Sequence, residues 1–203
     1  MRKQAASSAL ERAGIELVIV LILLVVALSV RLYHLQETPF GLNYDEAANG
    51  MDVFDILNGQ HSIFFERNHG REPLFIYLQA IVAAALGTTP FALRLTSALI
   101  GAMTVPAVYW MVREAFPGAS RWPAVWTALF LAFSYWHLNI SRIGYRVIML
   151  PLMAALTFAW FWRAWRSLDA GDRFPWVELL LCGVFTGASL YTYTAARLSL
   201  IHI

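Results

Sequence analysis

The chain has 203 residues, of which 59% are hydrophobic and 14% are charged. Soluble domains average about 45–50% apolar and about 25% charged residues, so this chain has more apolar surface than folding alone can hide from water. Because the apolar residues form several separate blocks, the sequence predicts a polytopic, all-α integral membrane protein. The net charge of +2 excludes a strongly basic nucleic-acid-binding protein. The single cysteine, Cys182, excludes a disulfide framework within the chain.

The first apolar block, residues 15–32, follows a short basic segment, as the apolar region of a signal peptide does. No small-residue cleavage site follows the block. We therefore predict an uncleaved signal anchor, with residues 1–14 in the cytoplasm and residues 15–203 forming one transmembrane domain. Residues 33–71 are the longest polar segment and are rich in acidic side chains. The positive-inside rule places this segment outside, in an external loop that is predicted to span residues 33–90.

Two short helices are expected inside the external loop. In the first, Ala47, Met51, Phe54 and Leu57 recur at helical spacing, and Asn58-Gly59 ends the pattern. This helix is expected to lie on the membrane with its apolar face down.

The second helix of the loop is expected at residues 73–86. Pro73 suits a first helical position and Gly87 ends the segment. The segment is too short to cross a bilayer of about 30 Å, so we expect an interfacial or re-entrant helix.

Four further apolar segments bring the predicted number of spans to about five. Apart from a set of external arginines, positive charge alternates between the two sides of the membrane, as a multi-pass topology requires. The chain stops in an apolar stretch with no room for another span, which indicates a truncated reading frame or a fragment. The four segments are residues 91–112, 122–138, 147–162 and 176–190, with a tight external turn at residues 139–146.

Several arginines lie on the external side against the positive-inside rule, and this makes them candidates for function. Arg94 is placed inside a span, where it either snorkels to the interface or clamps a phosphate with its planar guanidinium. Arg142 and Arg146 are four residues apart and would share one face of a helix. They either anchor the chain at the interface or hold a second anionic group. The external arginines are Arg71, Arg94, Arg142, Arg146 and Arg197.

Asp45 and Glu46 are adjacent acids at the expected start of the first loop helix. Acids at this position are favoured by the helix dipole and the free N–H groups. Alternatively, Asp45 is a general base and Glu46 orients the site or binds a metal ion. Either Arg71 or Glu72 completes the site around Asp45, and Glu46 and Glu72 together offer oxygen ligands to a divalent cation. In the alternative reading, Arg71 anchors the chain on lipid phosphates.

Four further sets of aromatic or polar residues are weaker candidates for a functional role. Trp136-His137 suits an interfacial aromatic belt. Asn139-Ile140-Ser141 matches a glycosylation sequon but lies in a short turn against the membrane. The segment 191–197 either forms another belt, anchored by Arg197, or contacts a sugar through its clustered hydroxyl groups. His61 and His69 lack the spacing of a metal site.

The order of these features resembles the N-terminal part of the polytopic GT-C glycosyltransferases. The likeness is to bacterial relatives of protein O-mannosyltransferases and lipid A aminoarabinose transferases, in glycosyltransferase family 39, and it runs from about residue 15 to the end. It is carried by Asp45-Glu46, by Arg-Glu-Pro-Leu-Phe-Ile-Tyr-Leu at residues 71–78, by Ala-Leu-Arg-Leu at residues 92–95, and by Ser-Arg-Ile-Gly-Tyr-Arg at residues 141–146.

The resemblance implies a GT-C fold with two juxtamembrane helices between the first two spans. It also implies a sugar donor linked to polyprenyl phosphate on the outer membrane face. The family's first-loop aspartate falls on Asp45, its acidic neighbour on Glu46, and its arginine at the outer end of the second span on Arg94. Many relatives have His-Pro-Pro or Glu-Lys-Pro at Arg71-Glu72-Pro73, and family members have many more spans than this chain.

The resulting prediction is an inverting glycosyltransferase of the plasma membrane, with its active site on the outer face. Asp45 takes a proton from the hydroxyl of a lipid, glycan or protein acceptor, and Arg94 with Arg71 stabilises the departing phosphate. No cofactor is firmly indicated, apart from the candidate divalent metal ion. Membrane lipids are expected partners and nucleic acids are not. The alternatives are a non-catalytic lipid-binding or transport protein that uses the same arginines, or an inactive fragment of the transferase.

Overall fold

The computed structural model describes residues 2–67, 70–171 and 173–196. The secondary structure of these residues is helical, with one isolated β-bridge between Phe65 and Arg71. The prediction of an all-α membrane fold is therefore confirmed. The helices are α1 (Arg2–Leu32), α2 (Tyr44–Leu57), α3 (Pro73–Leu86), α4 (Pro90–Ala115), α5 (Trp122–Phe133), α6 (Tyr135–Arg142), the 3₁₀ helix η1 (Arg146–Ile148), α7 (Met149–Asp169) and α8 (Trp176–Ser189).

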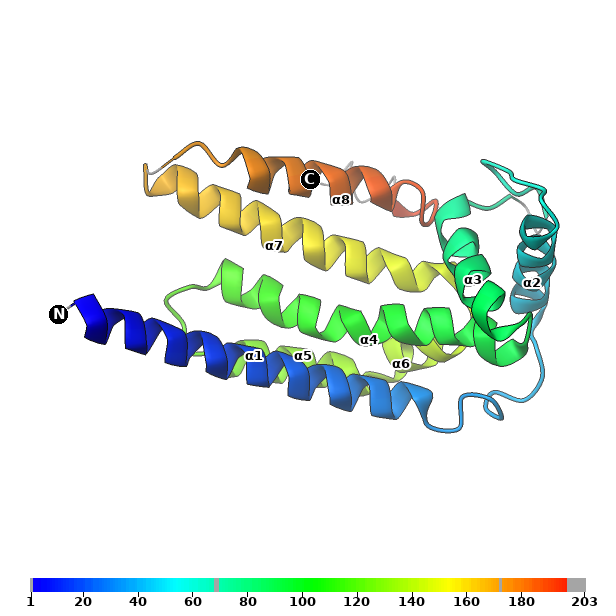
Figure 1. The fold of residues 1–203 in the computed structure, drawn as a ribbon, viewed down its shortest axis with the longest axis horizontal. Coiled ribbons are helices and arrows are strands. Elements are labelled where there is room, and N and C mark those ends of the chain that lie inside the picture. The colour runs from blue at the N-terminus through cyan, green and yellow to red at the C-terminus, as the bar shows by residue number, and fades with distance from the viewer. Residues whose placement is uncertain (1, 68–69, 172, 197–203) are drawn as a thin grey trace.

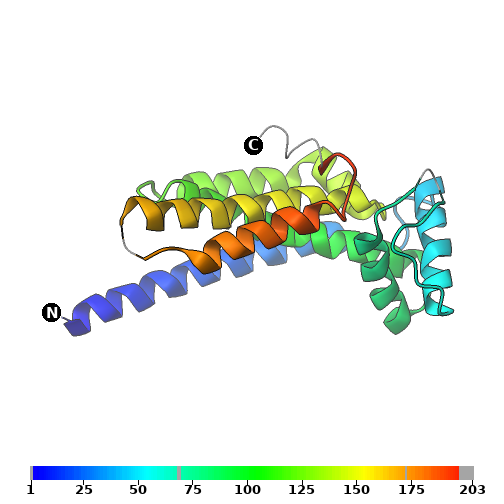
Figure 2. The same ribbon diagram turned by 90° about the horizontal axis from the view of Figure 1, so that it is seen from above.

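Five helices, α1, α4, α5, α7 and α8, run along the long axis of the molecule (Figure 1). The short helices α2 and α3 gather at the end of this bundle that lies far from the N-terminus, and Figure 2 shows the same arrangement from above. We call this end the α2–α3 end and the other the N-terminal end. Helix α4 is central because it packs against α1, α3, α5, α6 and α7.

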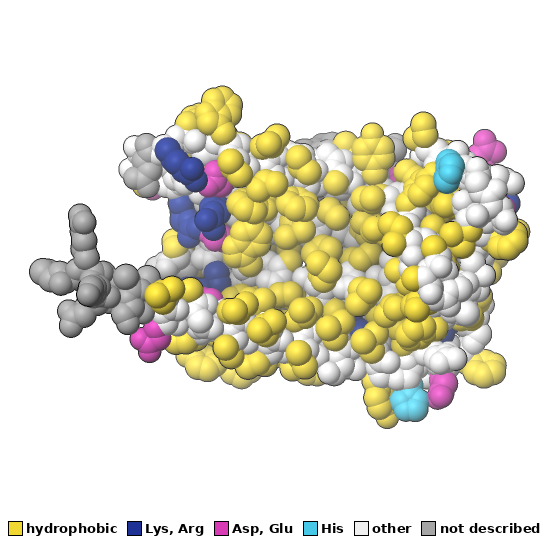
Figure 3. Space-filling model, in the orientation of Figure 1, with side chains coloured by type: hydrophobic (Ala, Val, Ile, Leu, Met, Phe, Trp, Pro, Cys, Tyr) yellow, Lys and Arg dark blue, Asp and Glu magenta, His cyan; other side chains and the backbone are white. Residues whose placement is uncertain are grey.

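Three helices of the described chain are long and apolar enough to cross a membrane: α1 from Ala13, α4, and the segment Arg146–Asp169. Hydrophobic side chains cover the middle of the bundle on the face seen in Figure 3. Helices α5 and α8 are apolar but have only 12 and 14 residues. At about 1.5 Å per residue, neither alone spans a hydrocarbon core of about 30 Å. Three of the five predicted spans therefore meet the length requirement as single helices.

The predicted third span, residues 122–138, is wrong in its extent. Helix α5 ends at Phe133, and Ser134 has an extended ψ of 121° that interrupts the helix. Helix α6 follows, so the predicted external turn at residues 139–146 is helical in its first half. Hydropathy hides this break because apolar and aromatic residues continue on both sides of Ser134.

The predicted fourth span also differs from the observed helix. Helix α7 runs to Asp169, beyond the predicted end at Trp162, so Arg163 and Arg166 lie on the helix and not in a loop. Their side chains reach Glu114 on α4, which gives the extended end of α7 a polar partner in the bundle.

The two loop helices have the predicted boundaries. Helix α2 begins with a capping box in which Asn43 and Glu46 bond each other's backbone N–H groups. Helix α3 has Pro73 in its first turn and ends at Gly87, whose φ of 81° favours glycine. The predicted apolar face of α2, formed by Ala47, Met51, Phe54 and Leu57, is exposed.

Gly101 lets α4 and α6 approach closely. A Cβ atom at Gly101 would overlap the Cβ atom of Ser141 on α6. Gly101→Ala is therefore expected to lower the free energy of unfolding by about 1–3 kcal/mol, as overpacking of a core does. The measurement is thermal denaturation in detergent micelles.

The matched control is Gly183→Ala in α8, where a Cβ atom has no neighbour within 4 Å. Because alanine is the better helix former, this substitution is expected to stabilise the protein by about 0.5–1 kcal/mol. Equal melting temperatures for the two variants would contradict the close approach at Gly101.

Candidate active site

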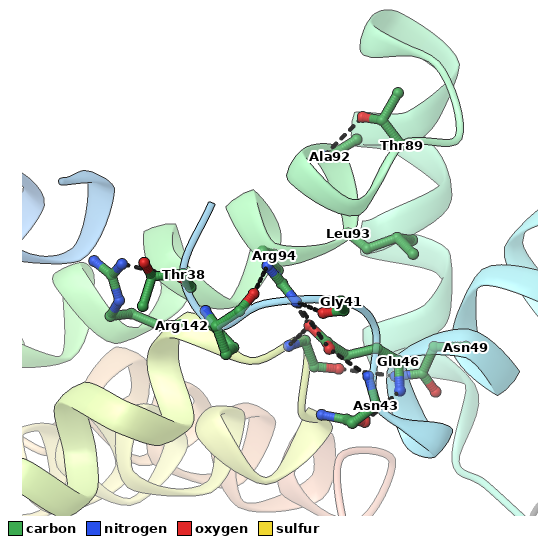
Figure 4. A network of polar contacts seen from close by, with 12 residues as sticks. Thr38, Gly41, Asn43, Glu46, Asn49, Thr89, Ala92, Leu93, Arg94 and Arg142 are labelled. Carbon is green, nitrogen blue, oxygen red and sulfur yellow. Dashed lines mark hydrogen bonds and ion pairs between the residues drawn. The ribbon is translucent and has the colours of Figure 1, made fainter. Parts of the chain in front are cut away.

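Asp45 and Glu46 are adjacent in α2, but their side chains lie in different environments. Glu46 is fully buried and pairs with Arg94 of α4, which is 1% exposed. Nε of Arg94 donates to Oε1 of Glu46 at 2.8 Å, and Nη2 donates to Oε2 at 3.3 Å. The pair lies at the centre of the polar network in Figure 4. It joins the start of α2 to the start of α4.

The other polar atoms of this pair also have protein partners. Nη1 of Arg94 donates to the carbonyl oxygen of Pro39 at 2.8 Å, and Nη2 donates to the carbonyl oxygen of Gly41. The carboxylate of Glu46 accepts the N–H groups of Asn43 at 3.0 Å and Gly144 at 3.1 Å. Arg94 and Glu46 therefore connect four segments of the chain: the loop before α2, α2 itself, α4, and the turn after α6.

Asp45 instead faces a cavity of about 640 Å³ at the α2–α3 end. Its side chain is 44% exposed, and Nη2 of the buried Arg71 lies 3.5 Å from Oδ1. The cavity is therefore open to a ligand on the side where Asp45 lies. Its polar and aromatic lining residues are Asp45, Asn49, Arg71, Trp136, Asn139, Tyr145, Arg146 and Tyr193.

Arg71 and Tyr145 set the electrostatics around Asp45. Burial lowers the pKa of Arg71, and the negative charge of Asp45 opposes this shift. Burial raises the pKa of Tyr145, and the charge of Asp45 and a hydrogen bond to its carboxylate add to the shift. Tyr145 therefore stays protonated and donates to Asp45, so the carboxylate is held between a phenol and a guanidinium.

Asn49 lies one helical turn after Asp45 and orients Arg71. Its Oδ1 atom accepts from Nη1 of Arg71, and its Nδ2 atom donates to the carbonyl oxygen of Gly144 at 2.9 Å. Arg71 Nη1 also donates to the carbonyl oxygen of Asp45 at 3.3 Å. These bonds fix the guanidinium of Arg71 beside the carboxylate of Asp45.

Arg146 forms the other positive side of the cavity. Its Nη1 atom lies 3.0 Å from Oε2 of Glu72, and its guanidinium lies 5.4 Å from the centre of the Tyr193 ring. Thr194 donates to Oε1 of Glu72 at 2.8 Å. Among the described residues, Arg146 contacts two oxygen atoms, Oε2 of Glu72 and the carbonyl oxygen of Gly70, and both contacts use Nη1.

Arg142 and Arg146 do not share one helical face, because α6 ends at Arg142 and η1 begins at Arg146. Arg142 donates to backbone carbonyl oxygens at the end of α1 and in the following loop, including those of Arg31 at 3.0 Å and Tyr33 at 2.7 Å. It thus caps the C-terminus of α1, where a cation is favoured by the helix dipole. Figure 4 shows its side chain directed at Thr38, away from Arg94.

The two glutamates suggested as metal ligands face different arginines, with Glu46 on Arg94 and Glu72 on Arg146. In the part of the chain that the structure describes, no group of three or more histidine, cysteine, aspartate or glutamate side chains is placed to hold a metal ion. His61 stacks on Tyr77. His69 and Arg197 lie outside the described residues.

No site role is predicted from the sequence for Asn49, Gly144 or Tyr145, although Gly144 and Tyr145 lie in the motif at residues 141–146. A role for Asn49 could have been predicted, because it lies four residues after Asp45 on an expected helix and therefore on the same face. Gly144 and Tyr145 follow α6, whose end the hydropathy pattern does not reveal. Trp136, Asn139 and Tyr193 also line the cavity. The sequence predicts a belt residue at Trp136, a turn residue at Asn139, and either a belt or a sugar contact for the segment of Tyr193. His137 instead bonds the buried Arg31 at 2.9 Å.

A family model described as dolichyl-phosphate-mannose-protein mannosyltransferase matches residues 15–194. The chain belongs to this family. The match includes the cavity residues from Asp45 to Tyr193, and it confirms the resemblance to GT-C glycosyltransferases. The family supports a membrane glycosyltransferase of the mannosyltransferase type. No curated protein and no solved structure matches the chain.

Proposed function

We propose that this member of the mannosyltransferase family transfers a sugar from a polyprenyl-phosphate donor to an acceptor hydroxyl, with inversion at the anomeric carbon. One observation carries the proposal: Asp45, Arg71 and Arg146 line the same cavity at the α2–α3 end. A carboxylate and two guanidiniums are the groups that a hydroxyl nucleophile and a phosphate leaving group need.

In the proposed reaction, Asp45 removes the proton from the acceptor hydroxyl as its oxygen attacks the anomeric carbon. The bond between that carbon and the phosphate oxygen breaks, and polyprenyl phosphate departs with the electron pair. Attack from the face opposite the phosphate inverts the configuration. Tyr145 and Arg71 hold the Asp45 carboxylate in place for this step.

The arginines of the cavity are proposed to bind the donor phosphate. Arg146 is proposed as the main phosphate contact, because its contacts with Glu72 and Gly70 use Nη1 and its side chain is 19% exposed. Guanidinium groups bind phosphate oxygens through several N–H bonds. Arg94 and Arg142, which face protein oxygens, are proposed to position the surrounding segments instead.

The family description names a dolichyl-phosphate-mannose donor and a protein acceptor. This supports a polyprenyl-phosphate mannose donor here, with a protein, glycan or lipid hydroxyl as the acceptor. The acidic loop 33–90 and the arginine-rich opposite end support a multi-pass protein of the plasma membrane with a cytoplasmic N-terminus. The cavity then opens on the outer face.

The test is sugar transfer by membranes that contain the protein, with radiolabelled polyprenyl-phosphate mannose as donor. We expect label in the acceptor fraction and an anomeric configuration in the product opposite to that of the donor. Membranes prepared without the protein are the control. Tight binding of the donor lipid without transfer to any hydroxyl acceptor would overturn the proposal in favour of a lipid-binding or transport protein.

Arg146→Gln is expected to lower the transfer rate about 10²-fold, since it removes a donor from the developing phosphate charge. Arg146→Lys, which keeps the charge without the planar fork, is expected to retain intermediate activity. Rates with saturating donor are the measurement.

Arg146 also neutralises the buried Glu72, so the single variant has a structural cost as well. The double variant Glu72→Gln with Arg146→Gln removes both charges and is expected to restore stability but not transfer. Recovery of transfer in the double variant would show that Arg146 acts only through Glu72.

A further inference from the structure

A second cavity lies at the N-terminal end of the bundle, far from Asp45. It has a volume of about 580 Å³ and is bounded by α1, α4, α7 and the loop between α4 and α5. Arginine and acidic side chains gather at this end in Figure 3. The charged lining residues of this cavity are Glu16, Arg113, Glu114, Arg121 and Arg166.

The acidic residues neutralise two of the three arginines. Nη2 of Arg113 lies 3.4 Å from Oε1 of Glu16, and Arg166 pairs with Glu114. Arg121 forms no ion pair and no side-chain hydrogen bond with any residue that the structure describes. The cavity therefore keeps one uncompensated positive charge, at its loop side.

Exposed aromatic residues surround this charge. Phe116 directly follows the last residue of α4, and Trp122 begins α5 directly after Arg121; both are more than half exposed. Phe174 and Trp176, at the start of α8, are also more than half exposed at the same end of the bundle. Aromatic side chains of this kind collect at the headgroup level of a bilayer. Arg121 therefore lies where lipid phosphates lie.

The wall of the cavity also suits a lipid. Val20 of α1 and Trp110 of α4 line it beside the arginines, so an acyl chain can pack below a headgroup. Basic pockets between membrane helices bind anionic headgroups, because the arginine fork matches phosphate oxygens and the helices shield the pair from bulk water.

We propose that this cavity binds the phosphate group of an anionic phospholipid, with Arg121 as its main contact and Arg113 and Arg166 beside it. A free phosphate ester offers the same oxygens, but the aromatic rim and the apolar wall favour a lipid. The site is independent of the sugar-transfer proposal, since its residues lie at the other end of the bundle and its test measures binding alone.

The experiment is native mass spectrometry of the protein released from detergent micelles, titrated with phosphatidylglycerol or with phosphatidylcholine. The wild type is expected to bind phosphatidylglycerol in preference. Arg121→Gln is expected to weaken that binding roughly fivefold, which corresponds to about 1 kcal/mol for one arginine near a lipid phosphate. Glu16→Gln is expected to strengthen it, because the substitution removes a negative charge from the cavity.

The matched control is Arg173→Gln, which removes the same charge at the same end of the bundle but outside this cavity. Its phosphatidylglycerol affinity is expected to equal that of the wild type. The proposed site would be contradicted if wild type and Arg121→Gln bound phosphatidylglycerol with equal affinity. It would also be contradicted if Arg173→Gln weakened this binding as much as Arg121→Gln does. Competition by inorganic phosphate at equal concentration would contradict the assignment of a lipid ligand and would indicate a free phosphate ester instead.

Discussion

Asp45→Asn is expected to reduce sugar transfer by about 10²–10⁴-fold, the contribution of a general base. Asparagine has the size of aspartate but cannot take the proton of an acceptor hydroxyl. Its amide oxygen can still accept from Tyr145 and Arg71, so the polar contacts of the side chain are largely retained. The measurement is the initial rate of transfer with saturating donor, at equal protein content in the membranes.

The fold is expected to survive this substitution. The capping box at the start of α2 uses Asn43 and Glu46 and does not involve the Asp45 side chain. Loss of the favourable charge at the helix N-terminus costs only about 0.3–1 kcal/mol. The melting temperature of Asp45→Asn should therefore stay close to that of the wild type, which separates loss of chemistry from loss of structure.

Asp55→Asn is the matched control, because it makes the same substitution near the other end of α2. Asp55 pairs with the exposed Arg67, which also pairs with Asp52. Arg67 therefore keeps an ion pair when the Asp55 carboxylate is removed. An exposed pair contributes about 0–1 kcal/mol, and transfer should be unchanged. Wild-type rates in Asp45→Asn would mean that the acid at this position serves the helix N-terminus alone.

Local sequence patterns were sufficient to predict the ends of the two loop helices, α2 and α3. Asn43 with Glu46, Pro73 and Gly87 mark helix ends through interactions with neighbouring backbone groups. The break at Ser134 could not be predicted, because the apolar residues continue across it. Hydropathy shows that a segment enters the membrane, but it does not show where the helical hydrogen bonds of its backbone are interrupted. The start and end of α6, and therefore the position of Tyr145, depend on packing against α4, which the local sequence pattern does not reveal.

The candidate site shows the same limit. Position on a helix placed Asp45 and Glu46 together at the start of α2, as predicted. Adjacent residues on a helix point about 100° apart, so only one of them can face the cavity. Which one faces it depends on Arg94 and Gly144, partners that are 48 and 98 residues away from Glu46 in the chain.

Glu46→Gln is expected to destabilise the protein by about 3–5 kcal/mol, since it leaves the buried guanidinium of Arg94 without its counter-charge. For a chain of this size, that corresponds to a fall in melting temperature of roughly 10 °C. Arg94→Gln is expected to have a similar cost, because it leaves the Glu46 carboxylate buried and unpaired. Thermal denaturation in detergent micelles is the measurement.

The double variant Glu46→Gln with Arg94→Gln separates the charge effect from the loss of packing. With both charges gone, two neutral amides remain in a buried region, and part of the lost stability is expected to return. The melting temperature of the double variant should lie above those of both single variants. A double variant whose losses simply add would show that the two charges do not stabilise each other.

The same series distinguishes a positioning role for Arg94 from a phosphate clamp. If Arg94 positions the start of α2, transfer and melting temperature fall together in Arg94→Gln, and both recover in part in the double variant. If Arg94 binds the donor phosphate directly, Arg94→Gln loses transfer while its melting temperature stays near that of the wild type. The contacts of its guanidinium with Glu46, Pro39 and Gly41 favour the first result, because a donor phosphate would have to displace protein oxygens that already hold the arginine.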